Sequence, residues 1–227
     1  MSELDHLAGI DPVVQESTPA IIARALRRAI SDGTVGPGDQ LGEAALARSL
    51  GVSRGPLREA MQRLTQEGLL VSHRNRGLFV AELTPEAVAD MYLLRTTVET
   101  AALDRVLDSG RGAEAAAALD AAVDVMAGLA GEPRSAAMVA ADLDFHHALV
   151  EAARSPRLSR VHETVLVETS MCLHAMRGTY TDAEARLSEH RAIADAVRAS
   201  DSVTARNLLV EHMNDGHARV RSGGAMS

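Results

Sequence analysis

The chain has 227 residues and is acidic, with 31 Asp and Glu side chains against 23 basic ones, all of them arginine. It contains no run that approaches the roughly 20 apolar residues of a membrane span, and its single cysteine, Cys172, excludes a disulfide framework within the chain. Because the start also lacks a positively charged, apolar leader, the sequence predicts a cytoplasmic protein with no membrane partner.

The N-terminal residues predict a tail followed by a helix. Residues 1–16 are mixed and polar, which is typical of a flexible tail. Ser17 or Thr18 can then cap a helix that begins at Pro19, because a hydroxyl at that position accepts from the free amides of the first turn.

The next segment predicts two helices joined by a tight turn. The first helix runs from about Glu43 to Leu50 and ends at Gly51, a residue suited to the left-handed position after a helix. Ser53 stands where the N-cap of the second helix belongs, and that helix runs to about Glu67.

An apolar stripe and a hairpin complete this unit. The stripe falls at i, i+4 and i+7 of the second helix and must be buried: Leu57, Met61 and Leu64. Residues 69–80 alternate well enough for two short strands around a turn at 75–77. This order of elements predicts a winged helix-turn-helix, although ordinary helical pairs share the same spacing.

The second helix carries side chains suited to DNA contact. Residues at the start of a recognition helix point at base edges. Four residues hold this position here: Ser53, Arg54, Gly55 and Pro56. Arg54 and Arg58 share a face, and each can bind guanine through two parallel hydrogen bonds. Arg48 on the preceding helix is placed to contact phosphate, and any of these arginines can hold the DNA backbone instead of a base.

Local charge supports double-stranded DNA as the partner, although the whole chain is acidic. Between Arg48 and Arg76 there are six arginines and only two acidic residues, Glu59 and Glu67. Phosphate contact depends on local potential more than on net charge. The alternative is a solvated arginine face on an ordinary helical subdomain.

The second half of the chain predicts an antiparallel helical bundle. It is rich in Ala and Leu, and Thr84 can cap a helix whose first residue is Pro85. Breaks rich in Gly, Ser and Pro leave six helices, at 84–109, 112–129, 134–153, 157–177, 182–199 and 202–221. A further break near Asp90 would make seven.

These elements together predict a mainly α fold with two domains. A winged helix-turn-helix over 17–80 is joined through a short linker, 81–83, to an all-α domain over 84–222. The helical domain is long enough to form its own core.

Four side chains of the helical domain predict a metal site. Asp142 and His146 lie one helical turn apart on an apolar stripe, so both can approach one ion. His190 interrupts the apolar series of the fifth helix of the bundle, and His212 lies on the apolar face of the sixth. A divalent cation would satisfy all four, whereas imidazoles and a carboxylate without partners are costly to bury.

Other polar residues of the helical domain are weaker candidates for a metal or ligand site. A single inward histidine is more often a hydrogen-bonded core residue than a ligand. Four histidines have no evident metal role: His147, His162, His174 and His217. Asp144, two residues before His146, faces away on a helix. Tyr92 and Tyr180 are candidates to line a ligand pocket.

The segment over 32–80 resembles the DNA-binding domain of GntR-family repressors. The shared pattern includes LGEAALARSLGVSRGPLREAMQRLTQEGL and a wing glycine, with mild departures at Val35, Gly42 and Leu57. The resemblance implies that the start of the second helix and Arg58 contact DNA. It also places three residues at a wing tip that reaches the minor groove: Arg74, Asn75 and Gly77.

The helical domain resembles FCD effector domains, of the FadR/VanR branch of that family. Two segments carry the likeness: DLDFHHALVEAARSPRL and EHRAIADAVRASDSVTARNLLVEHM. The resemblance implies that Asp142, His146, His190 and His212 bind a divalent metal ion, with zinc first and nickel, manganese or iron as alternatives. Arg95 matches an arginine common in the domain and could clamp a small carboxylate effector. An Arg95–Glu99 ion pair is the competing interpretation.

The sequence therefore predicts a DNA-binding transcription regulator that is not an enzyme. We expect a repressor that binds a palindromic operator as a homodimer and responds to an organic acid at the metal. A metal-responsive regulator, a structural metal and a helical metalloenzyme are the alternatives. The sequence shows no acid–base pair beside the ligands, no nucleophile elbow and no phosphate-binding glycine loop, which disfavours the enzyme.

Overall fold

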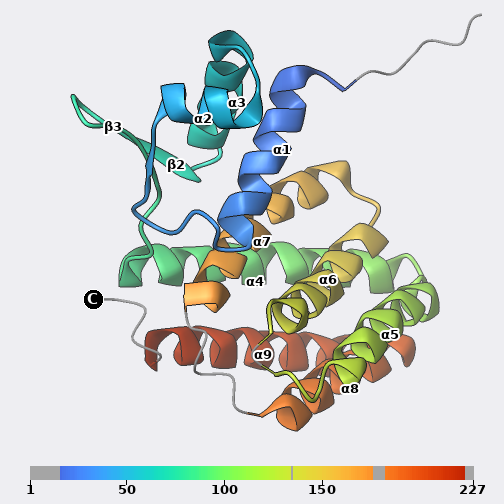
Figure 1. Ribbon diagram of the computed structural model, residues 1–227. Coiled ribbons are helices and arrows are strands. Elements are labelled where there is room, and N and C mark those ends of the chain that lie inside the picture. The colour runs from blue at the N-terminus through green and yellow to red at the C-terminus, as the bar shows by residue number, and fades with distance from the viewer. Residues whose placement is uncertain (1–15, 134, 176–181, 223–227) are drawn as a thin grey trace, which may run out of the picture.

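The computed structural model describes residues 16–133, 135–175 and 182–222. It has an N-terminal part, here called the head, above a helical bundle (Figure 1). The head consists of α1 (Thr18–Ser31), β1 (Gln40–Leu41), α2 (Glu43–Leu50), α3 (Arg54–Gln66), β2 (Leu70–His73) and β3 (Gly77–Val80). The bundle consists of α4 (Pro85–Asp108), α5 (Gly112–Gly128), α6 (Ala136–Ala152), α7 (Pro156–Ala175), α8 (Ala183–Arg198) and α9 (Ser202–Ser222). The predicted mainly α fold is confirmed. The predicted tail lies almost wholly outside the described residues.

The helices of the head begin and end where local chemistry places them. The Ser17 hydroxyl accepts from the Ala20 amide and caps α1. Gly51 adopts φ 64° after α2, a left-handed conformation that favours glycine. The predicted stripe of α3 is buried, with Leu57 and Leu64 fully enclosed against α1.

Two features of the head differ from the prediction. Ser53 occupies the N-cap position of α3, but its side chain makes no capping hydrogen bond. The predicted hairpin is part of a three-stranded antiparallel sheet of order β1-β3-β2, in which Gln40 pairs with Phe79. A strand of two residues is too short to show alternation, so β1 could not be recognised from the sequence.

The bundle matches the predicted helices closely in the part of the chain that the structure describes. α4 continues through Asp90 without a break, so this part contains six bundle helices. The Thr84 hydroxyl accepts from the Ala87 amide and caps α4. The main core lies between α4, α5, α6, α8 and α9, with Phe145 and Leu119 fully buried. No described helix is long and apolar enough to cross a membrane.

The head and the bundle are packed together through α7. Met171 is only 2% exposed and belongs to the hydrophobic core of the head. The Ser170 hydroxyl donates to the Ser31 carbonyl at 2.6 Å, at the last residue of α1. Figure 1 shows α1 reaching down to α7. The connection therefore involves more than the short linker after β3.

Candidate functional site

The predicted DNA-binding residues are exposed or half-buried on the head. Those at the start of α3 are accessible except for Pro56, which is half-buried. Arg48 and Arg58 are exposed, as are three residues of the wing: Arg74, Asn75 and Gly77. Asn75 has φ 62° and Gly77 φ 100°, so the wing turns through the left-handed region at both residues.

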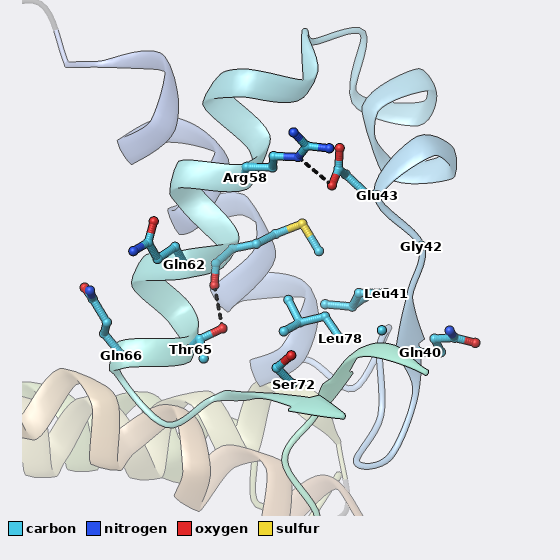
Figure 2. A pocket seen from close by; sticks show the side chains of 12 residues that line it. Gln40, Leu41, Gly42, Glu43, Arg58, Gln62, Thr65, Gln66, Ser72 and Leu78 are labelled. Atoms are coloured by element: carbon cyan, nitrogen blue, oxygen red, sulfur yellow. Dashed lines mark hydrogen bonds and ion pairs between the residues drawn. The ribbon is translucent and has the colours of Figure 1, made fainter. Parts of the chain in front are cut away.

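A groove of about 780 Å³ separates α3 from the sheet (Figure 2). At one end, Arg58 Nε donates to Glu43 Oε2 at 2.8 Å. At the other, Gln40 Nε2 donates to the carbonyl of Arg76, in the wing turn, at 2.6 Å. Gln40 is the first residue of β1 and Glu43 is the first residue of α2, so the short segment 40–43 contacts both α3 and the wing.

The four predicted metal ligands converge in the bundle. Asp142 and His146 come from α6, His190 from α8 and His212 from α9. All four are buried, and one potential ligand atom from each lies within 4.8 Å of the others. Asp144, on the same helix as two of them, is exposed, as its position in the sequence predicted.

Hydrogen bonds orient the three imidazoles. His146 Nδ1 donates to Glu99 Oε2 at 2.7 Å, and His212 Nδ1 donates to Glu189 Oε2 at 2.9 Å. His190 Nδ1 donates to the backbone carbonyl of Arg186 at 2.8 Å. Carboxylates and carbonyls only accept, so each Nδ1 holds a proton, and in the neutral form of each ring the lone pair is then on Nε2.

The lone pairs that result face one another and suit a cation. His146 Nε2 lies 3.1 Å from His212 Nε2, and His190 Nε2 lies 3.4 Å from Asp142 Oδ1. At the tetrahedral angle, two nitrogens bound to one zinc ion at about 2.1 Å lie roughly 3.4 Å apart, which is close to both distances. Asp142 Oδ1 and His190 Nε2 are buried and have no hydrogen-bond partner among the described residues. The donor set therefore fits a divalent metal ion.

The charge state of the cluster also suits a metal. Burial lowers the pKa of His146 to about 4 and that of His190 to about 3, so both imidazoles are neutral near pH 7. Burial alone would raise the pKa of Asp142, but the Arg186 guanidinium and the neighbouring imidazoles together outweigh this effect and hold that pKa below its usual range. Neutral imidazole and ionised carboxylate are the forms that bind metals.

A second group of charged residues surrounds the imidazoles. Arg95 Nε donates to Glu99 Oε1 at 2.8 Å, so the predicted ion pair exists. His162 Nε2 lies 3.0 Å from the same carboxylate oxygen. The sequence predicts no role for His162, because nothing in its spacing connects α7 with Glu99 on α4. The Arg95 Nη2 atom is buried and has no hydrogen-bond partner among the described residues.

Family models match both parts of the chain. The FCD domain matches residues 90–215, and the description "Bacterial regulatory proteins, gntR family" matches residues 20–80. The chain belongs to the GntR family. It is a transcription regulator with an FCD domain, and not an enzyme.

Individual relatives agree with this family. This GntR-family regulator is 28% identical over 189 residues to an uncharacterized HTH-type transcriptional regulator of Bacillus subtilis, across 83% of this chain and 84% of the relative. It is 28% identical to a probable D-xylose utilization operon transcriptional repressor of Paenarthrobacter nicotinovorans, across 81% and 80% of the two chains. A solved GntR transcriptional regulator from Rhodococcus is similar, with TM-score 0.76, 30% identity and coverage of 91% and 99%.

The charges around the cluster of this FCD domain balance one another. Three carboxylates and three guanidinium groups lie in contact with the cluster or with its direct partners: Asp142, Glu99, Glu189, Arg95, Arg186 and Arg219. These six charges cancel, so a divalent ion would bring a net charge of two positive units to this group. Such a site would attract an anion.

Of the two tyrosines predicted to line a ligand pocket, only Tyr92 lies within the described residues. Tyr92 is buried and stacks on His217, with ring centroids 5.2 Å apart, and the Arg95 guanidinium lies 6.0 Å from the Tyr92 ring centroid. Tyr92 therefore packs beside the residues that surround the cluster. Tyr180 lies outside the described residues.

Proposed function

We propose that this regulator is a repressor whose operator affinity is set by a small carboxylate effector at a metal ion in the FCD domain. The observation that carries the proposal is the buried cluster, in which three imidazole nitrogens and one carboxylate oxygen lie within 4.8 Å of one another. The repressor role is supported by the relative that is named a repressor, at 28% identity.

In this proposal α3 and the wing bind the operator. Arg54 and Arg58 contact bases in the major groove, Arg48 contacts phosphate, and the wing tip enters the minor groove. The residues assigned to these roles are exposed or half-buried on the head. Two copies of the chain would place two heads on a palindromic site, as is usual for regulators of this architecture.

The cluster residues would hold the metal ion, and the surrounding residues would hold the effector. Asp142, His146, His190 and His212 provide the ligands, with zinc first and nickel, manganese or iron as alternatives. When bound, the ion supplies positive charge for a carboxylate. Arg95 keeps one buried terminal nitrogen without a hydrogen-bond partner among the described residues, so it can pair with Glu99 and still donate to the effector.

A physical connection runs from this site to the head through α7. His162 near one end of the helix contacts Glu99, which orients His146. Ser170 and Met171 near the other end contact α1 and the core of the head. A change around Glu99 can therefore be transmitted along one rigid helix to the DNA-binding unit.

The test is operator selection from a random duplex library with zinc-loaded protein, chelator-stripped protein and the Arg54→Ala variant. We expect a two-fold symmetric site that zinc-loaded wild-type protein enriches, that Arg54→Ala does not enrich, and that stripped protein binds with altered affinity. Small carboxylates are then screened for those that release the zinc-loaded protein from this site.

The competing functions give different results in the same experiment. A metal-responsive regulator would switch its DNA affinity with zinc alone and ignore every carboxylate. A structural metal would change stability without changing operator affinity at a temperature where both forms are folded. Enrichment by Arg54→Ala equal to wild type would overturn the assignment of α3.

A further inference from the structure

Arg58 is held by a residue that has no DNA role in the sequence-based prediction. Glu43 is the first residue of α2, and its Oε2 accepts from Arg58 Nε at 2.8 Å across the mouth of the groove (Figure 2). The Arg58 side chain is 67% exposed, whereas that of Glu43 is 31% exposed. The arginine therefore projects into solvent while its inner nitrogen is anchored to the head.

We propose that Glu43 is a positioning residue that aims the Arg58 guanidinium at a guanine. The proposal rests on the proposed role of Arg58 in base contact. A guanidinium is planar and carries five N–H donors in a fixed fork. With Nε committed to Glu43, the two terminal nitrogens at the far end remain for the O6 and N7 acceptors of guanine.

This arrangement increases discrimination between bases rather than overall affinity. An unanchored arginine at a surface samples many rotamers and can contact phosphate as readily as a base. Anchoring Nε fixes the plane of the fork and lowers the entropy lost on binding. The Glu43 charge also repels phosphate, which weakens binding to DNA of unrelated sequence.

Two other roles for Glu43 must be separated from this one. An ion pair this exposed contributes little to folding, so the pair is not explained by stability. Glu43 also lies in the first turn of α2, where Gly42 occupies the N-cap without a side-chain hydrogen bond. An acidic residue there stabilises the helix through its dipole.

Two variants distinguish positioning from helix stabilisation. Glu43→Asp keeps the negative charge at the start of α2, but its carboxylate is one carbon–carbon bond, about 1.5 Å, further from Arg58. Glu43→Gln keeps the length and an acceptor oxygen but removes the charge. Positioning requires reach and an acceptor, whereas helix stabilisation requires charge, so the two roles predict opposite results for the two variants.

The experiment compares wild type, Arg58→Ala, Glu43→Asp, Glu43→Gln and the double variant Arg58→Ala/Glu43→Asp. Each selects from the same random duplex library, and thermal unfolding is followed for each. We expect Arg58→Ala to lose about tenfold or more discrimination at one guanine per half-site, the range given by one bidentate contact. Glu43→Asp should lose about fivefold of the discrimination at that guanine and none at other positions. Glu43→Gln should retain the wild-type discrimination at that guanine. The double variant should resemble Arg58→Ala.

Replacing that guanine by 7-deazaguanine, which lacks the N7 acceptor, adds a chemical readout. Wild type and Glu43→Gln should lose affinity on this DNA, whereas Arg58→Ala and Glu43→Asp should lose much less. If Arg58→Ala keeps wild-type base preference, the DNA role of Arg58 itself fails. The positioning role is overturned if Arg58→Ala loses the preference for this guanine while Glu43→Asp keeps it. It is also overturned if Glu43→Asp loses preference equally at every position of the operator.

Discussion

At the scale of residues, all three imidazoles direct Nε2 into the cluster because each Nδ1 has its own hydrogen-bond acceptor on the outer side. Glu99, the Arg186 carbonyl and Glu189 each accept a hydrogen bond from one Nδ1, which leaves three Nε2 atoms aimed at a common centre. Partners of this kind fix the tautomer of a metal-binding histidine and raise its basicity. The geometry of the cluster is therefore maintained by residues from α4 and α8 as well as by the ligands.

Replacing one ligand should abolish metal binding. His146→Ala removes an Nε2 lone pair, and we expect the zinc affinity to fall by more than about 100-fold, beyond the range seen for loss of an outer partner. Zinc content after dialysis and competition with a colorimetric chelator measure this effect. His147→Ala, at the adjacent half-buried histidine, is the matched control and should keep wild-type zinc content.

At the scale of elements, the wing is positioned by a strand of two residues. β1 pairs with β3, and Gln40 on β1 donates to the carbonyl at the turn between β2 and β3. A Cβ atom added at Gly77 would lie 3.2 Å from Gln40 Nε2, so the amide packs closely against the turn. The wing therefore depends on a contact from the segment that precedes α2.

Removing this contact should loosen the wing with little effect on folding. Gln40 is exposed, so Gln40→Ala should change the free energy of unfolding by less than about 0.5 kcal/mol. We expect a weaker base preference at the flanks of the selected operator, where the wing would meet the minor groove. The base preference at the central positions of the operator should be unchanged. Gln66→Ala, on the opposite side of the same groove (Figure 2), is the control; equal effects of both variants would contradict this role for Gln40.

At the scale of the whole molecule, α7 joins two hydrophobic cores. Met171 lies in the core of the head, while Cys172 and Leu173, the next residues, belong to a cluster of the bundle. Burial raises the pKa of the Cys172 thiol to about 12, which fits a packing role rather than a nucleophile. The head and the FCD domain are thus coupled by direct packing as well as by the covalent linker.

Loss of the Ser170 hydroxyl should weaken this coupling. Ser170→Ala leaves the Ser31 carbonyl without its partner, at a cost of about 1 kcal/mol in the free energy of unfolding. We expect operator affinity to respond less to metal loading than in wild type, as measured by fluorescence anisotropy. Ser159→Ala, roughly 16 Å earlier along α7, is the control, and a full response in Ser170→Ala would argue against transmission through this bond.

Metal removal should lower the stability of the whole protein. An ion present at 100 times its dissociation constant adds about 2.7 kcal/mol to the folded state. For a chain of this length, chelation should therefore lower Tm by about 5 to 10 °C. The same chelator should leave the Tm of His146→Ala unchanged; an equal shift in that variant would mean that the metal binds elsewhere.

The sequence by itself determined the helices, the wing hairpin and the residues of the candidate cluster. These follow from local rules: caps at Ser17 and Thr84, a left-handed glycine at Gly51, and one helical turn between Asp142 and His146. The choice of His190 and His212 also needed the resemblance to FCD domains, because a single histidine on an apolar face is more often a hydrogen-bonded core residue than a ligand.

Only the tertiary structure decided which residues support those sites. Glu99 and His146 are 47 residues apart in the sequence, and Arg58 and Glu43 are 15 apart on different helices. Whether such pairs meet depends on helix crossing angles and on the rotation of each helix about its axis, which side-chain packing sets collectively. The same holds for α7, whose residues Ser170 and Met171 show no sign in the sequence that they face the head.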